Sequence, residues 1–311
     1  MLFLDSNHPD LIRVLREAGF ECDEVYDLPK AEVEKIAHHY TALVIRSRFK
    51  IDHTFIDSAA NLKCIARAGA GMENIDVAYA TAKGIVCVHA SEGNRDAVGE
   101  QAVGMLLALM NNLLRADREV RSGIWLREEN RGYELDGKTV GIVGYGNMGS
   151  AFAKRLAGFN VRVLAYDKYK SGFGHAHVAE AKPEQLFEEA DVISLHVPLT
   201  PETRYLVNDA FIDRFRKPFW LLNTARGLCV DTAAVVNGLK SGRIIGAALD
   251  VLEYESVSFE QLDAKALPEP FKHLITSDRV ILSPHIAGWT FESHQKIANV
   301  LTDKILKTLN G

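Results

Sequence analysis

The sequence has few cysteines, no long apolar run and no large excess of one charge. Its four cysteines, at positions 22, 64, 87 and 229, are scattered without a CxxC pair, and this predicts reduced thiols rather than a disulfide framework or a metal site. The most apolar stretch, residues 102–110, is far shorter than the roughly 20 residues of a membrane helix. A formal net charge of −5 argues against a nucleic-acid or anionic-membrane surface.

The first residues, MLFLDSNHPDLIRVL, lack a basic region and a cleavage site. We therefore expect a cytoplasmic protein without a signal peptide. Hydrophobic residues make up 47% and charged residues 25% of the 311 residues, as in ordinary globular proteins. At about 100–200 residues per domain, this length suggests two domains.

Six apolar, β-branched runs alternate with helical stretches from residue 140 onward. They cover residues 140–144, 161–167, 191–199, 220–226, 244–251 and 280–285. Continuous apolar runs of this kind are typical of strands that are buried on both faces. The alternation predicts an α/β fold with a doubly wound parallel sheet, and six strands match the dinucleotide-binding (Rossmann) arrangement.

The first part of the chain shows its own, smaller alternation. Candidate strands cover residues 2–4, 21–26, 42–47, 63–68 and 85–89, which predicts a second open α/β sheet. A last amphipathic helix, near residues 290–309, is too short for a domain and should pack on this sheet. We therefore expect a discontinuous substrate domain, residues 1–91 and 286–311, into which a cofactor domain, residues 92–285, is inserted. The substrate would bind in the cleft between them.

A helix is expected at residues 96–121, and its first half is apolar nearly all round. Such a helix must be buried on several sides. It is either a core helix or a helix shared between the domain seam and a two-fold dimer interface.

A glycine-rich turn follows the run at residues 140–144. Gly144, Gly146 and Gly149 fit GxGxxG between a strand and a helix, which predicts a pyrophosphate site at the helix N-terminus. Asp167 lies 18 positions after Gly149 and can accept from both ribose hydroxyls, so it favours NAD over NADP. Lys168 and Lys170 weaken that preference, because either could pair with a 2′-phosphate.

Three late strands lead to polar groups suited to oxidising an alcohol, namely Arg226, Glu255 and His285. An imidazole, with an ordinary pKa of about 6.5, can accept the hydroxyl proton at neutral pH. A neighbouring carboxylate would stabilise the imidazolium, and an arginine would bind a substrate carboxylate. Each residue alone has a structural explanation. Together they predict hydride transfer at a hydroxy acid.

Five segments resemble motifs of the D-isomer-specific 2-hydroxyacid dehydrogenases. They are RAGAGMENID, GNRDAVGEQAVG, LLNTARGLCVD, GAALDVLEYE and SPHIAGWT, in the family's order. The resemblance implies an NAD-binding Rossmann domain inserted into a flavodoxin-like substrate domain, and usually a homodimer, here expected through the 96–121 helix region. Because the chain ends at Gly311, we expect a short form without the C-terminal regulatory domain that some phosphoglycerate dehydrogenases carry.

The resemblance also implies roles for individual residues. Arg226 would bind substrate, His285 would be the acid/base and Glu255 its carboxylate partner. Glu253 is the alternative, because Ser256 follows Glu255 where the family commonly has proline. The implied NAD contacts are Asn147, Met148, Asp167, Val197, Pro198, Thr224, Ala225, Asp250 and Gly288. The implied substrate contacts are the backbone of Ala70 and Gly71, and Asn94.

The stretch RSRFKI bears on the substrate. Arg46 and Arg48 are two apart on an expected strand and would point to the same side, where guanidinium forks could bind a phosphate. The stretch is similar to a segment of the family's phosphoglycerate dehydrogenases. This predicts oxidation of 3-phosphoglycerate to 3-phosphohydroxypyruvate, which begins serine biosynthesis. The alternatives are two solvated arginines and reduction of glyoxylate, hydroxypyruvate or another 2-keto acid. A more remote alternative is an NAD-sensing binding module. Arg127 and Arg131 lie in a loop that could reach a partner subunit.

Overall fold

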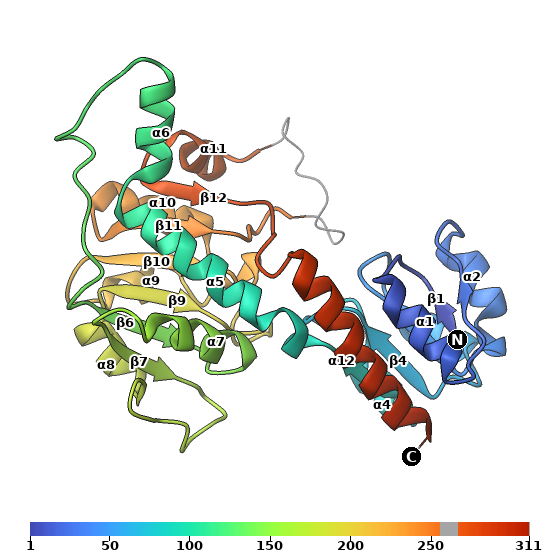
Figure 1. Ribbon diagram of the computed structural model, residues 1–311. Coiled ribbons are helices and arrows are strands. Elements are labelled where there is room, and N and C mark those ends of the chain that lie inside the picture. The colour runs from blue at the N-terminus through green and yellow to red at the C-terminus, as the bar shows by residue number, and fades with distance from the viewer. Residues whose placement is uncertain (256–266, 311) are drawn as a thin grey trace. The chain divides into compact units, whose positions relative to one another are not determined.

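The computed structural model describes residues 1–255 and 267–310 (Figure 1). The chain forms two compact units, Met1–Arg95 with Gly288–Gly311, and Asp96–Ala287. Each unit contains a parallel sheet, of five and seven strands respectively, so the predicted α/β fold class is confirmed. The functional boundaries that we expect from the sequence, residues 1–91 with 286–311 and residues 92–285, stay a prediction.

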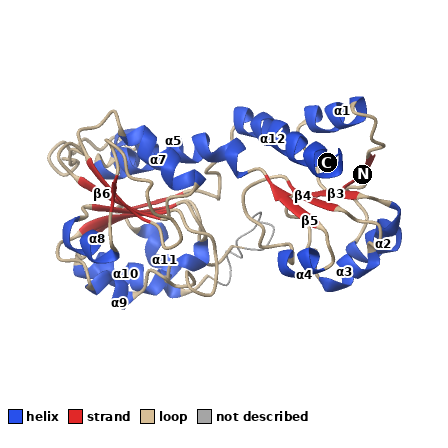
Figure 2. Cartoon of the chain, turned by 90° about the horizontal axis from the view of Figure 1, so that it is seen from below, coloured by secondary structure: helices blue, strands red, loops and turns tan. Residues whose placement is uncertain are grey.

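The first unit has a sheet with the strand order β2-β1-β3-β4-β5. Its strands are β1 (Leu2–Phe3), β2 (Asp23–Glu24), β3 (Ala42–Ile45), β4 (Cys64–Arg67) and β5 (Val86–His89). Its helices are α1 (Pro9–Glu17), α2 (Lys30–Ile36), α3 (His53–Ser58), α4 (Val77–Ala82) and α12 (Phe291–Asn310). Alternate strand residues face opposite sides, so Phe3 packs with α1 and α12, whereas Leu2 packs with α2 and α3. Figure 2 shows these two helical layers.

The second unit has the strand order β12-β11-β10-β9-β6-β7-β8. Its strands are β6 (Thr139–Val143), β7 (Arg162–Tyr166), β8 (Ala179–Glu180), β9 (Val192–Leu195), β10 (Phe219–Asn223), β11 (Ile244–Leu249) and β12 (Val280–Leu282). All pairings are parallel. The order reverses between β6 and β9, and ligands bind at such a switch point, beyond the carboxyl ends of the strands. The sequence did not predict β8, whose two residues are too few to form an apolar run.

Helices cover both faces of this second sheet (Figure 2). They are α5 (Ser91–Met110), α6 (Leu113–Arg121), α7 (Asn147–Leu156), α8 (Pro183–Glu189), α9 (Asp209–Asp213), α10 (Thr232–Ser241) and α11 (Glu269–Thr276). Leu106 and Phe152 belong to the core on one face, and Leu186, Leu239 and Leu274 belong to the core on the other.

The single helix expected at residues 96–121 is two helices. Asn112 has a left-handed backbone (φ 54°) between α5 and α6, and α-helical hydrogen bonding does not continue through such a residue. Leu106 in α5 is fully buried, whereas Leu113 in α6 is 54% exposed. In the described part of the chain, no single helix is long and apolar enough to span a membrane. Only α5 and α6 taken together, across a 62° bend, reach that length and composition.

His196 follows β9 and gives the fold a pH-sensitive group. Burial lowers the pKa of its imidazole to about 3, and its Nε2 lies 2.8 Å from the Ser194 hydroxyl. Because the unfolded state takes up a proton near an ordinary histidine pKa and the folded state does not, stability falls as pH falls below that value. We expect His196→Gln to reduce the stability lost between about pH 7 and about pH 5 by roughly 2 kcal/mol.

Urea denaturation at several pH values measures this effect. Ser194→Ala is the matched control, because it removes the hydroxyl but keeps the imidazole and should keep the full pH dependence. Equal acid losses in wild type and His196→Gln would contradict the assignment.

Candidate active site

The turn between β6 and α7 has the geometry of a pyrophosphate cradle. Gly144 has φ +94°, and a Cβ there would lie 2.5 Å from the His196 carbonyl oxygen. A Cβ on Gly149 would collide with the Gly144 carbonyl oxygen. Gly146 differs, because a Cβ there would meet nothing within 4 Å. Gly146 is the N-cap of α7 and has no side chain that could cap the helix, and a helix N-terminus of this kind suits an anion.

Asp167 follows β7 and holds this turn in place by hydrogen bonds. Its Oδ2 accepts a hydrogen bond from the Tyr145 N–H (2.8 Å) and its Oδ1 from the Tyr169 N–H (2.9 Å). A carboxylate has about four acceptor positions, so capacity remains for ribose hydroxyls. The two nearby lysines are engaged elsewhere. The Lys168 ammonium contacts Glu202 at 2.7 Å, and that of Lys170 donates to the Tyr145 carbonyl at 3.3 Å. These contacts fit NAD better than NADP.

A buried asparagine shapes the loop after β10, and the sequence analysis missed it. The Asn223 side chain donates to the Arg226 carbonyl and accepts from the Ala225 N–H, each at 3.0 Å. The Thr224 hydroxyl is buried and has no hydrogen-bond partner among the described residues. An orphaned polar atom at the carboxyl edge of this sheet fits a cofactor contact. In the sequence, the apolar run of β10 ends in Asn223 and is followed by Thr224, and this pattern could have identified both polar residues.

His285 is paired with Glu255. Its Nδ1 lies 2.7 Å from the Glu255 Oε2, and the side chains are 21% and 16% exposed. The other Glu255 oxygen accepts from the Leu252 N–H. Glu253 instead binds the Tyr205 hydroxyl and the Thr232 N–H, each at 3.0 Å. The structure therefore assigns the carboxylate partner of His285 to Glu255. Ser256 lies outside the described residues.

Asp250 holds the His285 turn. His285 has a left-handed backbone (φ 53°), which is rare for residues other than glycine, and its N–H donates to the Asp250 carbonyl at 2.8 Å. The Asp250 side chain is fully buried. Its carboxylate accepts from Gln101 Nε2 (3.0 Å), Ser283 Oγ (2.6 Å) and the N–H groups of Ile286 (3.0 Å) and Ala287 (2.8 Å). Asp250 therefore positions His285, a role that the sequence analysis did not identify. Its expected contact with NAD stays a prediction.

The expected catalytic groups follow neighbouring strands. Arg226 follows β10, Glu255 lies in the segment after β11, and His285 follows β12. Arg226 is half-buried, and its Nη1 donates to the Ala225 carbonyl at 2.7 Å. Val197 and Pro198 follow β9, and Met148 lies in the first turn of α7. The carboxyl edge thus carries an anion cradle after β6, and an arginine with an imidazole–carboxylate pair after β10, β11 and β12.

The expected substrate residues of the first unit lie beyond β4 and at the start of α5. Ala70 and Gly71 follow Gly69, which has φ +152°. Because Gly69 has no Cβ, the Arg67 guanidinium can lie against it. The side-chain oxygen of Asn94 is buried without a hydrogen-bond partner in the described chain, which fits a residue that meets a ligand. Gly288 has φ +86°, and its carbonyl accepts from the Ser293 hydroxyl.

The two arginines expected to bind phosphate behave differently. Because β3 ends at Ile45, Arg46 and Arg48 lie beyond it, so the argument that they share a strand face is wrong. The Arg48 guanidinium donates to the carbonyls of Leu4, Val25 and Leu28. The Arg46 guanidinium instead lies 4.7 Å from the centre of the Trp289 ring. Arg48 therefore has a structural function, and Arg46 is the better candidate for binding a ligand.

Comparisons with known proteins agree with this geometry. Residues 103–287 match the NAD-binding domain of the D-isomer specific 2-hydroxyacid dehydrogenases. The chain is 39% identical to a glyoxylate reductase of Thermofilum pendens, over 96% of this chain and 90% of that protein. It is 35% identical to a D-3-phosphoglycerate dehydrogenase of Archaeoglobus fulgidus, over 97% of this chain but only 56% of that protein. The chain thus spans about half the length of that relative.

A solved structure is similar over both units. A D-lactate dehydrogenase of Aquifex aeolicus, complexed with NAD and lactic acid, is 27% identical with a TM-score of 0.84, over 100% of this chain and 98% of that one.

The two glycines of the cradle should respond differently to the same added methyl group. Gly146→Ala meets no protein atom within 4 Å, so we expect unchanged stability but at least roughly tenfold weaker NAD binding, because the methyl occupies the phosphate space. Gly149→Ala should destabilise the fold by about 1–3 kcal/mol, because its methyl collides with backbone. Titration calorimetry with NAD and urea denaturation separate the two effects. Unchanged NAD affinity in a folded Gly146→Ala variant would rule out this cradle.

Proposed function

The chain belongs to the NAD-dependent D-isomer specific 2-hydroxyacid dehydrogenases, and on that premise we propose that it interconverts 3-phosphoglycerate and 3-phosphohydroxypyruvate. The main support for this reaction is the contact between His285 Nδ1 and Glu255 Oε2 at 2.7 Å. The hydrogen bonds of Asp250 hold the turn on which His285 lies. NAD, when bound, accepts the hydride from the substrate carbon. The residues of this chain must therefore bind the acid, orient its hydroxyl and take up the hydroxyl proton.

His285 is the proposed proton acceptor. Its Nδ1 is occupied by Glu255, so Nε2 is the nitrogen that would take the proton from the substrate hydroxyl. The imidazole becomes positively charged in that step, and the Glu255 carboxylate stabilises the charge while it holds the ring in place. In the reverse direction the same Nε2 returns the proton to the carbonyl oxygen.

Arg226 is the proposed carboxylate-binding residue. A guanidinium can donate two parallel hydrogen bonds to a carboxylate, and the buried Asn223 side chain holds the Arg226 backbone. The backbone at Ala70 and Gly71 is the proposed substrate contact of the first unit. Asn94, with its buried unpartnered oxygen, would bind the substrate from the first unit.

The phosphate of the substrate is the finer part of the proposal. Neighbouring strands β3 and β4 lead to Arg46 and Arg67 at the same edge of the first sheet, and guanidinium groups favour a multiply charged anion. A second candidate is reduction of glyoxylate or hydroxypyruvate. It is favoured by the carbonyl contacts of Arg48 and by the similarity to the Thermofilum pendens reductase.

Glu255→Gln should separate catalysis from cofactor binding. The neutral amide cannot stabilise the imidazolium, so we expect kcat to fall by about 10²–10⁴-fold, with NAD affinity unchanged. NADH absorbance, measured with D-2-hydroxy acids with and without phosphate, provides the assay. Glu253→Gln is the matched control, because Glu253 contacts Tyr205 and Thr232 rather than His285.

The panel of acids also decides the substrate. A higher kcat/KM for 3-phosphoglycerate than for D-glycerate supports the proposed substrate, whereas faster turnover of glyoxylate or hydroxypyruvate supports the second candidate. NAD binding without turnover of any acid would indicate the NAD-sensing alternative.

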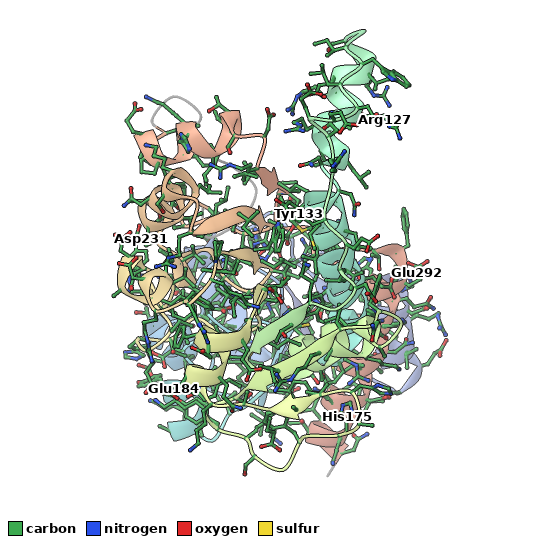
Figure 3. All side chains as sticks on the ribbon, turned by 90° about the vertical axis from the view of Figure 1, so that its left-hand side faces the viewer. Arg127, Tyr133, His175, Glu184, Asp231 and Glu292 are labelled. Atoms are coloured by element: carbon green, nitrogen blue, oxygen red, sulfur yellow. The ribbon has the colours of Figure 1, made fainter. Side chains whose placement is uncertain are left out.

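We also propose that the chain forms a homodimer through α6 and the segment after it. This region exposes several large apolar side chains, and Figure 3 shows Arg127 on the part that extends beyond the second sheet. The exposed fractions are Leu113 54%, Leu114 53%, Val120 51%, Ile124 45%, Trp125 81% and Leu126 42%. Several large apolar side chains exposed along one segment are typical of a protein interface. Because α5 contains many buried residues and α6 contains none, the dimer contact expected over residues 96–121 would involve α6 rather than the whole region.

Trp125→Lys should weaken this dimer. A charged side chain at the most exposed aromatic position of the patch would have to be buried on association, so we expect monomers at micromolar concentrations. Light scattering coupled to size exclusion measures the mass. Phe291→Lys, at an aromatic residue that is 96% exposed elsewhere, is the matched control and should leave the mass unchanged. A dimeric Trp125→Lys variant would place the interface elsewhere.

A further inference from the structure

Four side chains that are distant in sequence cluster at the carboxyl edge of the first sheet. The Arg46 guanidinium lies 4.7 Å from the centre of the Trp289 ring. The Trp289 and His294 rings are 5.9 Å apart, and the His294 and His8 rings meet edge to face at 5.4 Å. His8 follows β1 and Arg46 follows β3, whereas Trp289 and His294 belong to the start of α12 and the turn before it.

The backbone holds each member of this cluster in place. The His8 Nδ1 accepts from the Asp10 N–H at 3.3 Å and so caps α1, which leaves Nε2 to carry the ring proton and donate. The Arg46 N–H donates to the Asp5 carboxylate at 2.6 Å. Reciprocal hydrogen bonds between Thr290 and Ser293, each 3.0 Å, fix the turn between Trp289 and His294. Groups held in this way bind a ligand with less loss of conformational entropy.

Two groups that carry or can take up positive charge, His8 and Arg46, lie beside His294. The pKa of His294 lies below its ordinary value because the imidazole is partly buried and because His8 and Arg46 add positive charge beside it. Its Nε2 is buried and lacks a hydrogen-bond partner within the described residues. The acids that face the cluster are already engaged. Asp5 binds the Arg46 N–H, and Asp10, 3.6 Å from His8, also binds Arg13 and Gln295.

We propose that His8, Arg46 and His294 form an oxyanion subsite, with Trp289 as its wall, that binds the phosphate ester of the substrate. Arg46 supplies a permanent charge and the two imidazoles supply N–H donors, a combination that suits a tetrahedral dianion better than a neutral hydroxyl. The inference rests on the proposed function for the identity of the substrate. Inorganic phosphate shares the same chemistry and serves as a probe that does not depend on turnover.

Binding of the anion should be linked to protonation of His294. A dianion beside the imidazole favours its charged form, so the pKa of His294 must rise on binding. The gain in affinity is then present at low pH and is lost as pH rises through the raised pKa of the complex. Arg46 remains charged throughout this range.

Proton NMR of the imidazole C–H resonances tests the subsite without catalysis. The probe is inorganic phosphate added to the full chain, and His8→Gln and His294→Gln identify the two signals. We expect phosphate to raise the pKa of His294 and to shift the His8 signal. An unchanged His294 titration at saturating phosphate would overturn the proposal, as would the same change with chloride at equal ionic strength.

Kinetics then separate this inference from the proposed function. His294→Gln should lower kcat/KM for 3-phosphoglycerate by about tenfold, the effect of losing one charge-assisted hydrogen bond, and leave that for D-glycerate unchanged. His39→Gln, at an exposed histidine of the same unit, is the matched control.

The two proposals fail in distinguishable ways. Phosphate binding at His294 in a protein that does not oxidise 3-phosphoglycerate contradicts the proposed substrate and supports the subsite. Oxidation of 3-phosphoglycerate that is equally fast in His294→Gln, with no NMR response, supports the proposed function and overturns the subsite. Equal losses with 3-phosphoglycerate and D-glycerate would assign His294 a structural role and also overturn it.

Discussion

The buried carboxylate of Asp250 is the interaction on which the arrangement of the site depends. A left-handed backbone at a residue such as His285 costs of order 1–3 kcal/mol, and the structure must supply the contacts that hold it. Asp250 supplies these contacts. Its carbonyl oxygen accepts from the His285 N–H. Its carboxylate oxygens accept from Gln101 in α5, from Ser283 after β12 and from the N–H of Ala287 in the turn that follows. The buried Asp250 therefore holds the backbone turn at His285, and Glu255 holds the imidazole.

Both units place their polar groups by the same rule. Parallel strands end together at one edge, where the backbone is released from the sheet and side chains can converge. In the second unit this edge carries the glycine cradle, Asp167 and the His285–Glu255 pair. In the first unit it carries Arg46, Arg67 and His89.

Sequence patterns predicted most of the fold because a buried parallel strand is a continuous apolar run, and such runs are visible without coordinates. They failed where this signal is short or ambiguous. Strand β8 has only two residues. The break between α5 and α6 depends on the backbone of Asn112, in a stretch that is otherwise helical in pattern. The spacing of Arg46 and Arg48 predicts one strand face, but β3 ends before either of them.

The sequence by itself determined the fold class, the glycine cradle and the types of residue at the strand ends, because apolar runs, glycine spacing and the alternation of strands with helices along the chain are local or nearly local properties. Only the tertiary structure decided which of those residues meet. It paired His285 with Glu255 rather than Glu253, bound Gln101 to Asp250 across 149 positions and brought His8, Arg46 and His294 together. Such contacts depend on how distant segments pack, and no pattern along a single chain encodes a distance in space.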